Sequence, residues 1–156
     1  MEKGPAYDVF GREDMAAIKL QYDVPGDDFT RAGEASADLK LRLKKLGLPS
    51  ETVRRAAIAL YEGEINLAIH AGGGHIDVEV RPEAIEMQLT DTGPGIENVE
   101  LAMREGYSTA PDEVRSLGFG AGMGLPNMRR NADEFFIQST VGVGTEIHMG
   151  FSQAAR

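Results

Sequence analysis

Glu62 and Asn66 are the first pair of residues in this chain whose types and spacing suggest chemistry. They lie four positions apart in the run Glu62-Gly63-Glu64-Ile65-Asn66, so on a helix they share one face, one turn apart. An asparagine oxygen is a hard, neutral ligand suited to Mg²⁺, and a nearby carboxylate can accept a proton from an attacking hydroxyl or water. The pair predicts a metal-and-base site. The alternative is two polar residues on the solvent face of a helix, where Glu64 is also expected.

A second candidate is Asp91, which follows a short alternating segment and opens the turn Asp91-Thr92-Gly93-Pro94-Gly95. An ionised carboxylate only accepts hydrogen bonds, so it suits the exocyclic amino group of adenine. Guanine presents a carbonyl there and would be repelled. Gly93 and Gly95 would let the backbone lie close to a flat base. The alternative is an ordinary turn.

Alternating glycines mark the third candidate, a loop in which backbone N–H groups could approach phosphates. A helix beginning directly after the loop would add its N-terminal partial positive charge. The pattern lacks the Gly-Lys-Ser/Thr of a P-loop and the preceding strand of a dinucleotide fingerprint, and a merely flexible loop is the alternative. The candidate residues are Gly118, Gly120, Gly122, Met123, Gly124 and Leu125. Nearby arginines that could meet phosphates are Arg104, Arg115, Arg129 and Arg130.

Hydrophobic periodicity predicts the elements that must position these residues. A strand over residues 18–24 is followed by a helix that Asp27 or Asp28 caps and Gly47 ends. A second helix opens at Pro49-Ser50, with Ser50 as its cap, and ends at Gly72 to Gly74. The remaining predicted elements are a hairpin of residues 76–80 and 85–89, a short helix over 97–104, a helix from Met123 or Leu125 to Ala132, and a hairpin of residues 135–140 and 145–149.

This element order predicts an α+β two-layer sandwich, with a mixed, mostly antiparallel sheet and helices on one face. With 156 residues the chain has room for one domain, expected over residues 16–156 behind a loose arm of residues 1–15. The absence of cysteine excludes thiolate metal sites, disulfides and cysteine nucleophiles.

The charge balance and the hydropathy bound the classes of partner. A formal net charge of −9 argues against nucleic-acid binding, which needs basic clusters. No apolar run approaches the length of about 20 residues that spans a membrane, and the N-terminal residues lack the pattern of a secretory signal. A cytoplasmic protein without membrane contact is the expectation.

Taken together and in this order, the three motifs resemble those of the GHKL superfamily of ATP-binding domains over about residues 18–151. Glu62-x-x-x-Asn66 is similar to the N box, Asp91-x-Gly93-x-Gly95 to the first glycine box, and Gly120-x-Gly122-x-Gly124 to the second. The resemblance implies a Bergerat-type two-layer sandwich that binds ATP between helices and sheet. It further implies Glu62 as general base, Asn66 as Mg²⁺ ligand, Asp91 as adenine reader and the second glycine box as phosphate cradle.

Within that superfamily, the length and the run from Gly118 to Phe135 resemble the stand-alone serine kinases of bacterial partner switching, most of all the switch-kinase (RsbT-like) branch. No room is expected for a transducer domain or for the helical hairpin of a histidine kinase. The resemblance implies a protein partner, namely an anti-sigma-factor antagonist, a sigma factor or a phosphatase. It also allows a homodimer, since dimers are common in the anti-sigma branch.

Four hypotheses follow from these expectations. The first is a Mg²⁺-ATP-dependent serine/threonine kinase, and the second is a nucleotide-gated binding module with little or no catalysis. The third is a plain ATPase that uses water as acceptor, and the fourth is a purely structural domain. The relation of His70, four residues after Asn66, to the site is left open.

Overall fold

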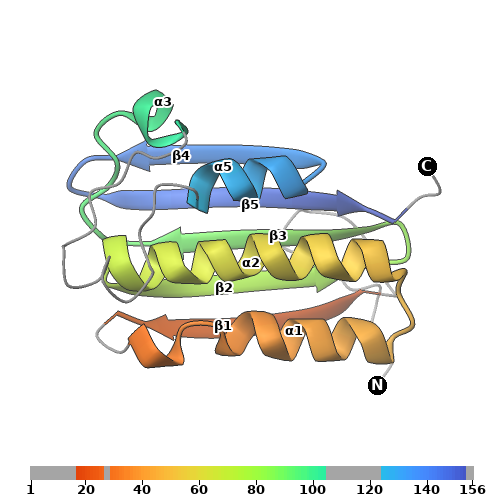
Figure 1. Ribbon diagram of the computed structural model, residues 1–156. Helices are drawn as coiled ribbons and strands as arrows, with labels where there is room; N and C mark the ends of the chain where they lie inside the picture. The colour runs from red at the N-terminus through yellow and green to blue at the C-terminus, as the bar shows by residue number, and fades with distance from the viewer. Residues whose placement is uncertain (1–16, 27–28, 105–123, 154–156) are drawn as a thin grey trace, which may run out of the picture.

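The computed structural model describes residues 17–26, 29–104 and 124–153. The arm expected at residues 1–15 therefore lies outside the described residues. Within them, helices and a five-stranded sheet form two layers, as Figure 1 shows. The α+β sandwich predicted from the element order is thereby confirmed.

The sheet has the strand order β1-β2-β3-β5-β4, and all four of these pairings are antiparallel. Alternation along each strand sends one row of side chains toward the helices and the other toward the opposite face. The expected mixed sheet is thus antiparallel throughout the described residues. The strands are β1 (Ile18–Pro25), β2 (Gly73–Val80), β3 (Ala84–Asp91), β4 (Glu134–Thr140) and β5 (Gly144–Ser152).

The helix layer covers one face of this sheet (Figure 1). It consists of α1 (Glu34–Lys45), α2 (Ser50–His70) and α5 (Gly124–Asn131), with the 3-10 turn η1 (Phe29–Arg31) before α1 and the short α3 (Val99–Ala102) after β3. The core between the layers is aliphatic and aromatic. Its fully buried side chains include Leu39, Leu43, Leu60, Met128, Ile76, Met87, Met149 and Phe151.

The first helix starts later than the sequence predicts. It begins at Glu34, after a 3-10 turn and after Gly33, whose φ of 109° is left-handed. No side chain of the helix's own N-cap residue satisfies its first N–H groups. Instead, the carboxylate of Glu64 on α2 accepts hydrogen bonds from the backbone N–H groups of Gly33 (3.0 Å), Ala35 (2.9 Å) and Ser36 (2.8 Å). The predicted cap at Asp27 or Asp28 is wrong because a residue distant in sequence caps this helix.

Glycines end the first two helices as predicted. Gly47 has a φ of 80°, and its N–H donates to Lys44 O while that of Leu48 donates to Leu43 O, which is a Schellman ending. The second helix ends at His70 and is followed by Ala71 and Gly72, with a φ of 74° at Gly72. Ser50 is not a cap, since Pro49 is the N-cap residue and Ser50 is already helical.

Candidate functional site

Helix α2 carries the predicted base and metal ligand side by side. Glu62 and Asn66 are both half-buried, and their spacing places them one turn apart on one face. Gly63 lets this part of the helix lie close to the sheet, because a Cβ there would come within 2.3 Å of the Leu89 side chain on β3. The site is thereby built on a helix fixed against the central strand.

Glu64 occupies the opposite side of α2. Only 2% of this residue is exposed, and its three backbone donors come from the start of α1. The expectation that Glu64 is solvated is wrong. The physical reason is that the positive end of α1 lies against α2 and provides N–H partners for a buried carboxylate.

The Glu62 carboxylate faces the beginning of α5. Asn127 Nδ2 donates a hydrogen bond of 3.0 Å to Glu62 Oε2, and a Cβ placed on Gly124 would lie 3.7 Å from Glu62 Oε1. The end of the second glycine box is therefore next to the predicted base. Gly118, Gly120, Gly122 and Met123 lie outside the described residues, whereas Gly124 and Leu125 form the start of α5.

Asp91 ends β3, and its carboxylate Oδ1 accepts a 2.9 Å hydrogen bond from the N–H of Gly93. This turn lies against the end of α2, since a Cβ on Gly93 would come 2.6 Å from Ala71 O. Glycine is thus required there by close approach of two backbones. The Asp91 turn therefore lies at the end of α2, at left in Figure 1, where β3 also ends. Asn66 and Glu62 lie about one and two turns before that end of α2, and Glu62 faces the glycine that opens α5.

The turn after Asp91 is also tied to the hairpin between β4 and β5. Pro94 O accepts from the N–H of Gly142 (2.8 Å), and the N–H of Ile96 donates to Ser139 Oγ (2.7 Å). Gly95 has a φ of 80°, and a Cβ there would lie 2.4 Å from Thr140 O. These anchors were missed by sequence reasoning, because nothing local to Ser139 or Gly142 signals a contact so distant in sequence.

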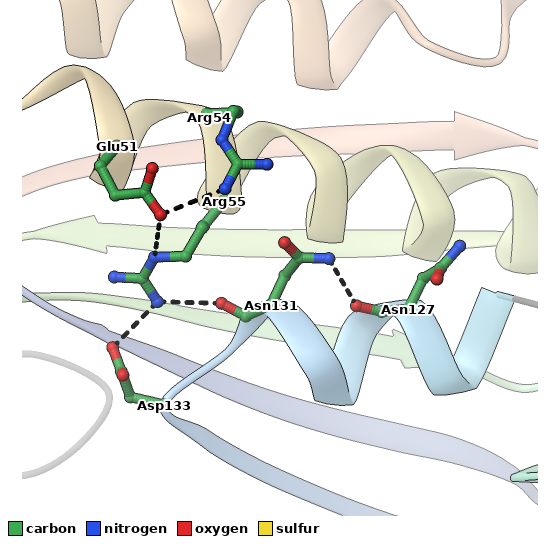
Figure 2. A network of polar contacts seen from close by, with 6 residues as sticks. All are labelled: Glu51, Arg54, Arg55, Asn127, Asn131 and Asp133. Atoms are coloured by element: carbon green, nitrogen blue, oxygen red, sulfur yellow. Dashed lines mark hydrogen bonds and ion pairs between the residues drawn. The ribbon is translucent and has the colours of Figure 1, made fainter.

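Helix α5 is docked on α2 by a polar network at its other end (Figure 2). Arg55 Nη1 donates to Asn131 O (3.0 Å) and pairs with Asp133 Oδ2 (3.2 Å). Asp133 Oδ2 also accepts from the N–H of Ser152 (2.7 Å). The Arg55 side chain is only 12% exposed, so this contact holds α5, α2 and the sheet together from a partly desolvated position.

His70, at the last position of α2, is half-buried. Burial lowers the pKa of its imidazole, which favours the neutral ring near neutral pH. A neutral ring beside Asn66 would not repel a cation.

The donor set suits a metal held mainly by a nucleotide. No group of three or more histidine, aspartate or glutamate residues is arranged to hold a metal ion in the described ranges. Asn66, one neutral oxygen donor, matches the usual mode of Mg²⁺, which takes one or two protein ligands together with phosphate and water oxygens.

In the same described part of the chain, no helix is both long and apolar enough to cross a membrane.

Comparison with known proteins places these features in context. Residues 52–155 match the model of the histidine kinase-, DNA gyrase B-, and HSP90-like ATPase family. The serine/threonine-protein kinase RsbT of Bacillus subtilis is 33% identical over 108 residues, which cover 67% of this chain and 75% of the relative. The anti-sigma F factor of Caldanaerobacter subterraneus is 31% identical over 140 residues, covering 90% of this chain and 81% of the relative.

A solved structure supports the fold. The crystal structure of the RsbU and RsbW domains of a Mycobacterium tuberculosis protein superposes with a TM-score of 0.59 at 16% identity. The match covers 89% of this chain and 33% of that larger chain. At this identity the likeness concerns the fold alone.

Proposed function

Because the chain belongs to the histidine kinase-, DNA gyrase B-, and HSP90-like ATPase family, we propose that it is an ATP-dependent serine/threonine protein kinase of a bacterial partner-switching system. Its proposed acceptor is an antagonist protein of the anti-sigma type, and its proposed binding partner is a sigma factor or a phosphatase. The names of its relatives, a serine/threonine-protein kinase and anti-sigma F factors, support this class. The cytoplasm is the proposed location, since such partners act there.

One observation carries the proposal: Asn66 and Glu62 follow one another along α2 between the Asp91 turn, which packs against the end of α2, and the glycine that opens α5, which faces Glu62. A nucleotide spanning this edge would place adenine at the Asp91 turn. Its phosphates would lie near the N-terminus of α5, whose partial positive charge favours anions. Asn66 and Glu62 would then lie beside the phosphates, where transfer of the γ-phosphoryl group needs a metal ion and a residue that orients the attacking hydroxyl.

In the proposed reaction, an acceptor hydroxyl attacks the γ-phosphorus while Glu62 takes its proton. A new O–P bond forms, the bond between the γ-phosphorus and its bridging oxygen breaks, and ADP leaves with that electron pair. Glu62 Oε1, which faces Gly124, is the oxygen placed for the proton, since Oε2 is bonded to Asn127. Asn66 would hold Mg²⁺, which supplies neutralisation of phosphate charge when bound.

Asp91 would select adenine. Its Oδ1 accepts a hydrogen bond from the Gly93 N–H, which restricts the orientation of the carboxylate. Its Oδ2 offers a further acceptor for the adenine amino group. A guanine carbonyl at that place would meet a negative charge without a proton between them.

Calorimetric titration of ATP, ADP and GTP, with and without Mg²⁺, tests the nucleotide site. We expect wild type to bind the adenine nucleotides, Asn66→Ala to lose the dependence on Mg²⁺, and Asp91→Asn to lose the preference for adenine. No binding of any nucleotide by wild type would contradict the proposal.

Transfer is tested with [γ-³²P]ATP and purified antagonist proteins from the same genome. Label on serine or threonine, stable to acid and dependent on Glu62, would support the kinase. Nucleotide-dependent partner binding without label transfer would support a nucleotide-gated module instead. Steady phosphate release without acceptor, of order 1 s⁻¹ or more, would support a plain ATPase.

A further inference from the structure

We infer that Asn127, a residue outside the three motifs, is the positioning residue that holds the Glu62 carboxylate for proton transfer. The inference rests on the proposed function, in which Glu62 is the base. Asn127 lies on α5 and its Nδ2 donates to Glu62 Oε2 at 3.0 Å, although the two residues are 65 positions apart. Both side chains are half-buried, so this bond is formed at the rim of the site.

Arg130 fixes which way the Asn127 amide points. Its Nη1 donates to Asn127 Oδ1 at 2.7 Å. Arginine has donors only, so the asparagine oxygen must face Arg130 and the NH₂ group must face Glu62. The relay Arg130–Asn127–Glu62 therefore presents a neutral donor to the carboxylate and keeps the arginine one residue away from it.

Contacts at the C-terminal end of α5 determine which part of α2 Asn127 faces. Asn131, one turn further along α5, donates from Nδ2 to Asn127 O (2.9 Å), and Asn131 O accepts from Arg55 (3.0 Å). Since Arg55 and Glu62 are both on α2, the two helices run in opposite directions and touch through polar contacts at two points. Figure 2 shows the one at Arg55. Asn127 is held at one of these points.

A neutral donor on Oε2 has two effects on a base. It restricts rotation of the carboxylate about its terminal bond, and it leaves Oε1 directed toward Gly124, at the end of the glycine box. Placement of a reacting group matters, because misplacement by about 1 Å can cost on the order of a hundredfold in rate. An arginine in the place of Asn127 would instead pair with the carboxylate and compete with the acceptor proton.

The test compares γ-phosphate loss from Mg-ATP in wild type, Asn127→Leu and Asn127→Asp, with the protein acceptor where one is identified and with water otherwise. Leucine removes the donor at similar volume, and aspartate keeps an oxygen for Arg130 while it turns an acceptor toward Glu62. We expect kcat to fall about tenfold or more in both variants, with KM for ATP and melting temperature close to wild type. The matched control is Gln21→Leu, which removes an exposed amide on the edge strand β1 whose partner is Asp77, outside the contacts between α2 and α5, with kcat expected close to that of wild type.

A double-mutant cycle separates positioning from general structure. In a Glu62→Gln background, Asn127→Leu should have no further effect on kcat, because the base that it positions is already gone. Independently of catalysis, the side-chain amide resonance of Asn127 in a ¹⁵N–¹H spectrum should move in Glu62→Ala while that of Asn131 stays in place.

The possible results distinguish failure of the base role of Glu62 from failure of the positioning role of Asn127. A wild-type rate in Glu62→Gln, or no phosphate loss in wild type, would overturn the base role and this inference with it. A slow Glu62→Gln together with unaffected Asn127 variants would overturn the inference alone. Equal losses of kcat from Asn127→Leu in both backgrounds, or an Asn127 resonance that ignores Glu62→Ala, would also overturn the inference alone.

Discussion

Glu62 and Glu64 are two carboxylates on neighbouring positions of the same helix, and their surroundings differ sharply. Two residues along a helix correspond to about 200° of rotation, so the side chains leave α2 on opposite sides. Glu64 is buried and accepts three backbone N–H groups of the α1 start. Glu62 is half-exposed and holds one neutral side-chain donor. The environment, not the residue type, gives Glu64 its structural role and leaves Glu62 accessible as the proposed base.

Glu64→Ala should destabilise the protein strongly. The substitution leaves the N–H groups of Gly33, Ala35 and Ser36 without their carboxylate partner in a buried place. We expect a loss of about 3 kcal/mol in the free energy of unfolding, measured in urea. The control is Glu51→Ala, whose side chain is 67% exposed on the same helix, with a change within about 0.5 kcal/mol. A loss from Glu64→Ala no larger than that of the control would contradict the capping role.

His75 should make stability depend on pH. Its Nδ1 lies 2.8 Å from Asp23 Oδ1 and its Nε2 lies 3.2 Å from Asp77 Oδ1. The hydrogen bond to Asp23 is the largest cause that raises the pKa of this imidazole, and the charge of Asp77 acts the same way. A raised pKa in the folded state means that the stabilisation is complete below the unfolded value of about 6.5 and is lost as pH rises through the folded value.

The corresponding measurement is urea unfolding of wild type and His75→Gln at about pH 5.5 and about pH 8.5, either side of the unfolded histidine pKa. We expect the substitution to cost more at the lower pH. In an Asp23→Asn, Asp77→Asn background this difference between the two pH values should disappear. An equal cost at both pH values in the parent protein would show that the charged imidazole does not stabilise the fold.

At the scale of elements, the separation between α2 and β3 is set by a residue without a side chain. A Cβ on Gly63 would lie 2.3 Å from Leu89 Cδ2 and 3.6 Å from Met128 Sδ. Leu89 and Met128 are fully buried or nearly so. The glycine between the predicted base and the capping carboxylate therefore brings the helix down onto the core.

Gly63→Ala should overpack this contact. We expect a loss of about 1–3 kcal/mol in stability, equivalent to about 2–4 °C of melting temperature per kcal/mol for a chain of this size. The readout is the melting temperature by calorimetry. Adding Leu89→Val, which removes the methyl that the new Cβ would meet, should recover part of the loss. A melting temperature unchanged by Gly63→Ala alone would contradict the close approach.

The elements with a clear local pattern could be predicted from sequence, and those fixed by distant partners could not. Alternation located the strands, and Gly47 and Gly72 located the ends of α1 and α2. The start of α1 was misplaced because its cap, Glu64, is 28 to 31 residues away. The Glu62 and Asn66 pair was visible through its helical spacing, whereas Asn127 was not, since its partner lies on another helix.

At the scale of the whole molecule, nucleotide binding should increase the thermal stability of the protein. A ligand that binds only the folded state at about 100 times its Kd adds about 2.7 kcal/mol. With about 2–4 °C per kcal/mol, saturating Mg-ATP should raise the melting temperature by about 5–10 °C, and GTP should have little effect. Differential scanning fluorimetry checks this, with Asp91→Asn as the variant that should lose the difference between nucleotides. Equal shifts from ATP and GTP in wild type would contradict adenine selection.

The strand order carries one more consequence. Asp91 is the last residue of β3, which is the middle strand of five and is bonded along both sides, to β2 and to β5. Edge strands open first, and their amide hydrogens exchange through local fraying, whereas a central strand exchanges only when most of the sheet has opened. The amides of β3 should therefore be among the last to take up deuterium. Fraying of the edge strand β1 would leave both pairings of β3 in place, whereas fraying of the edge strand β4 would release the Ser139 contact that holds the turn after Asp91.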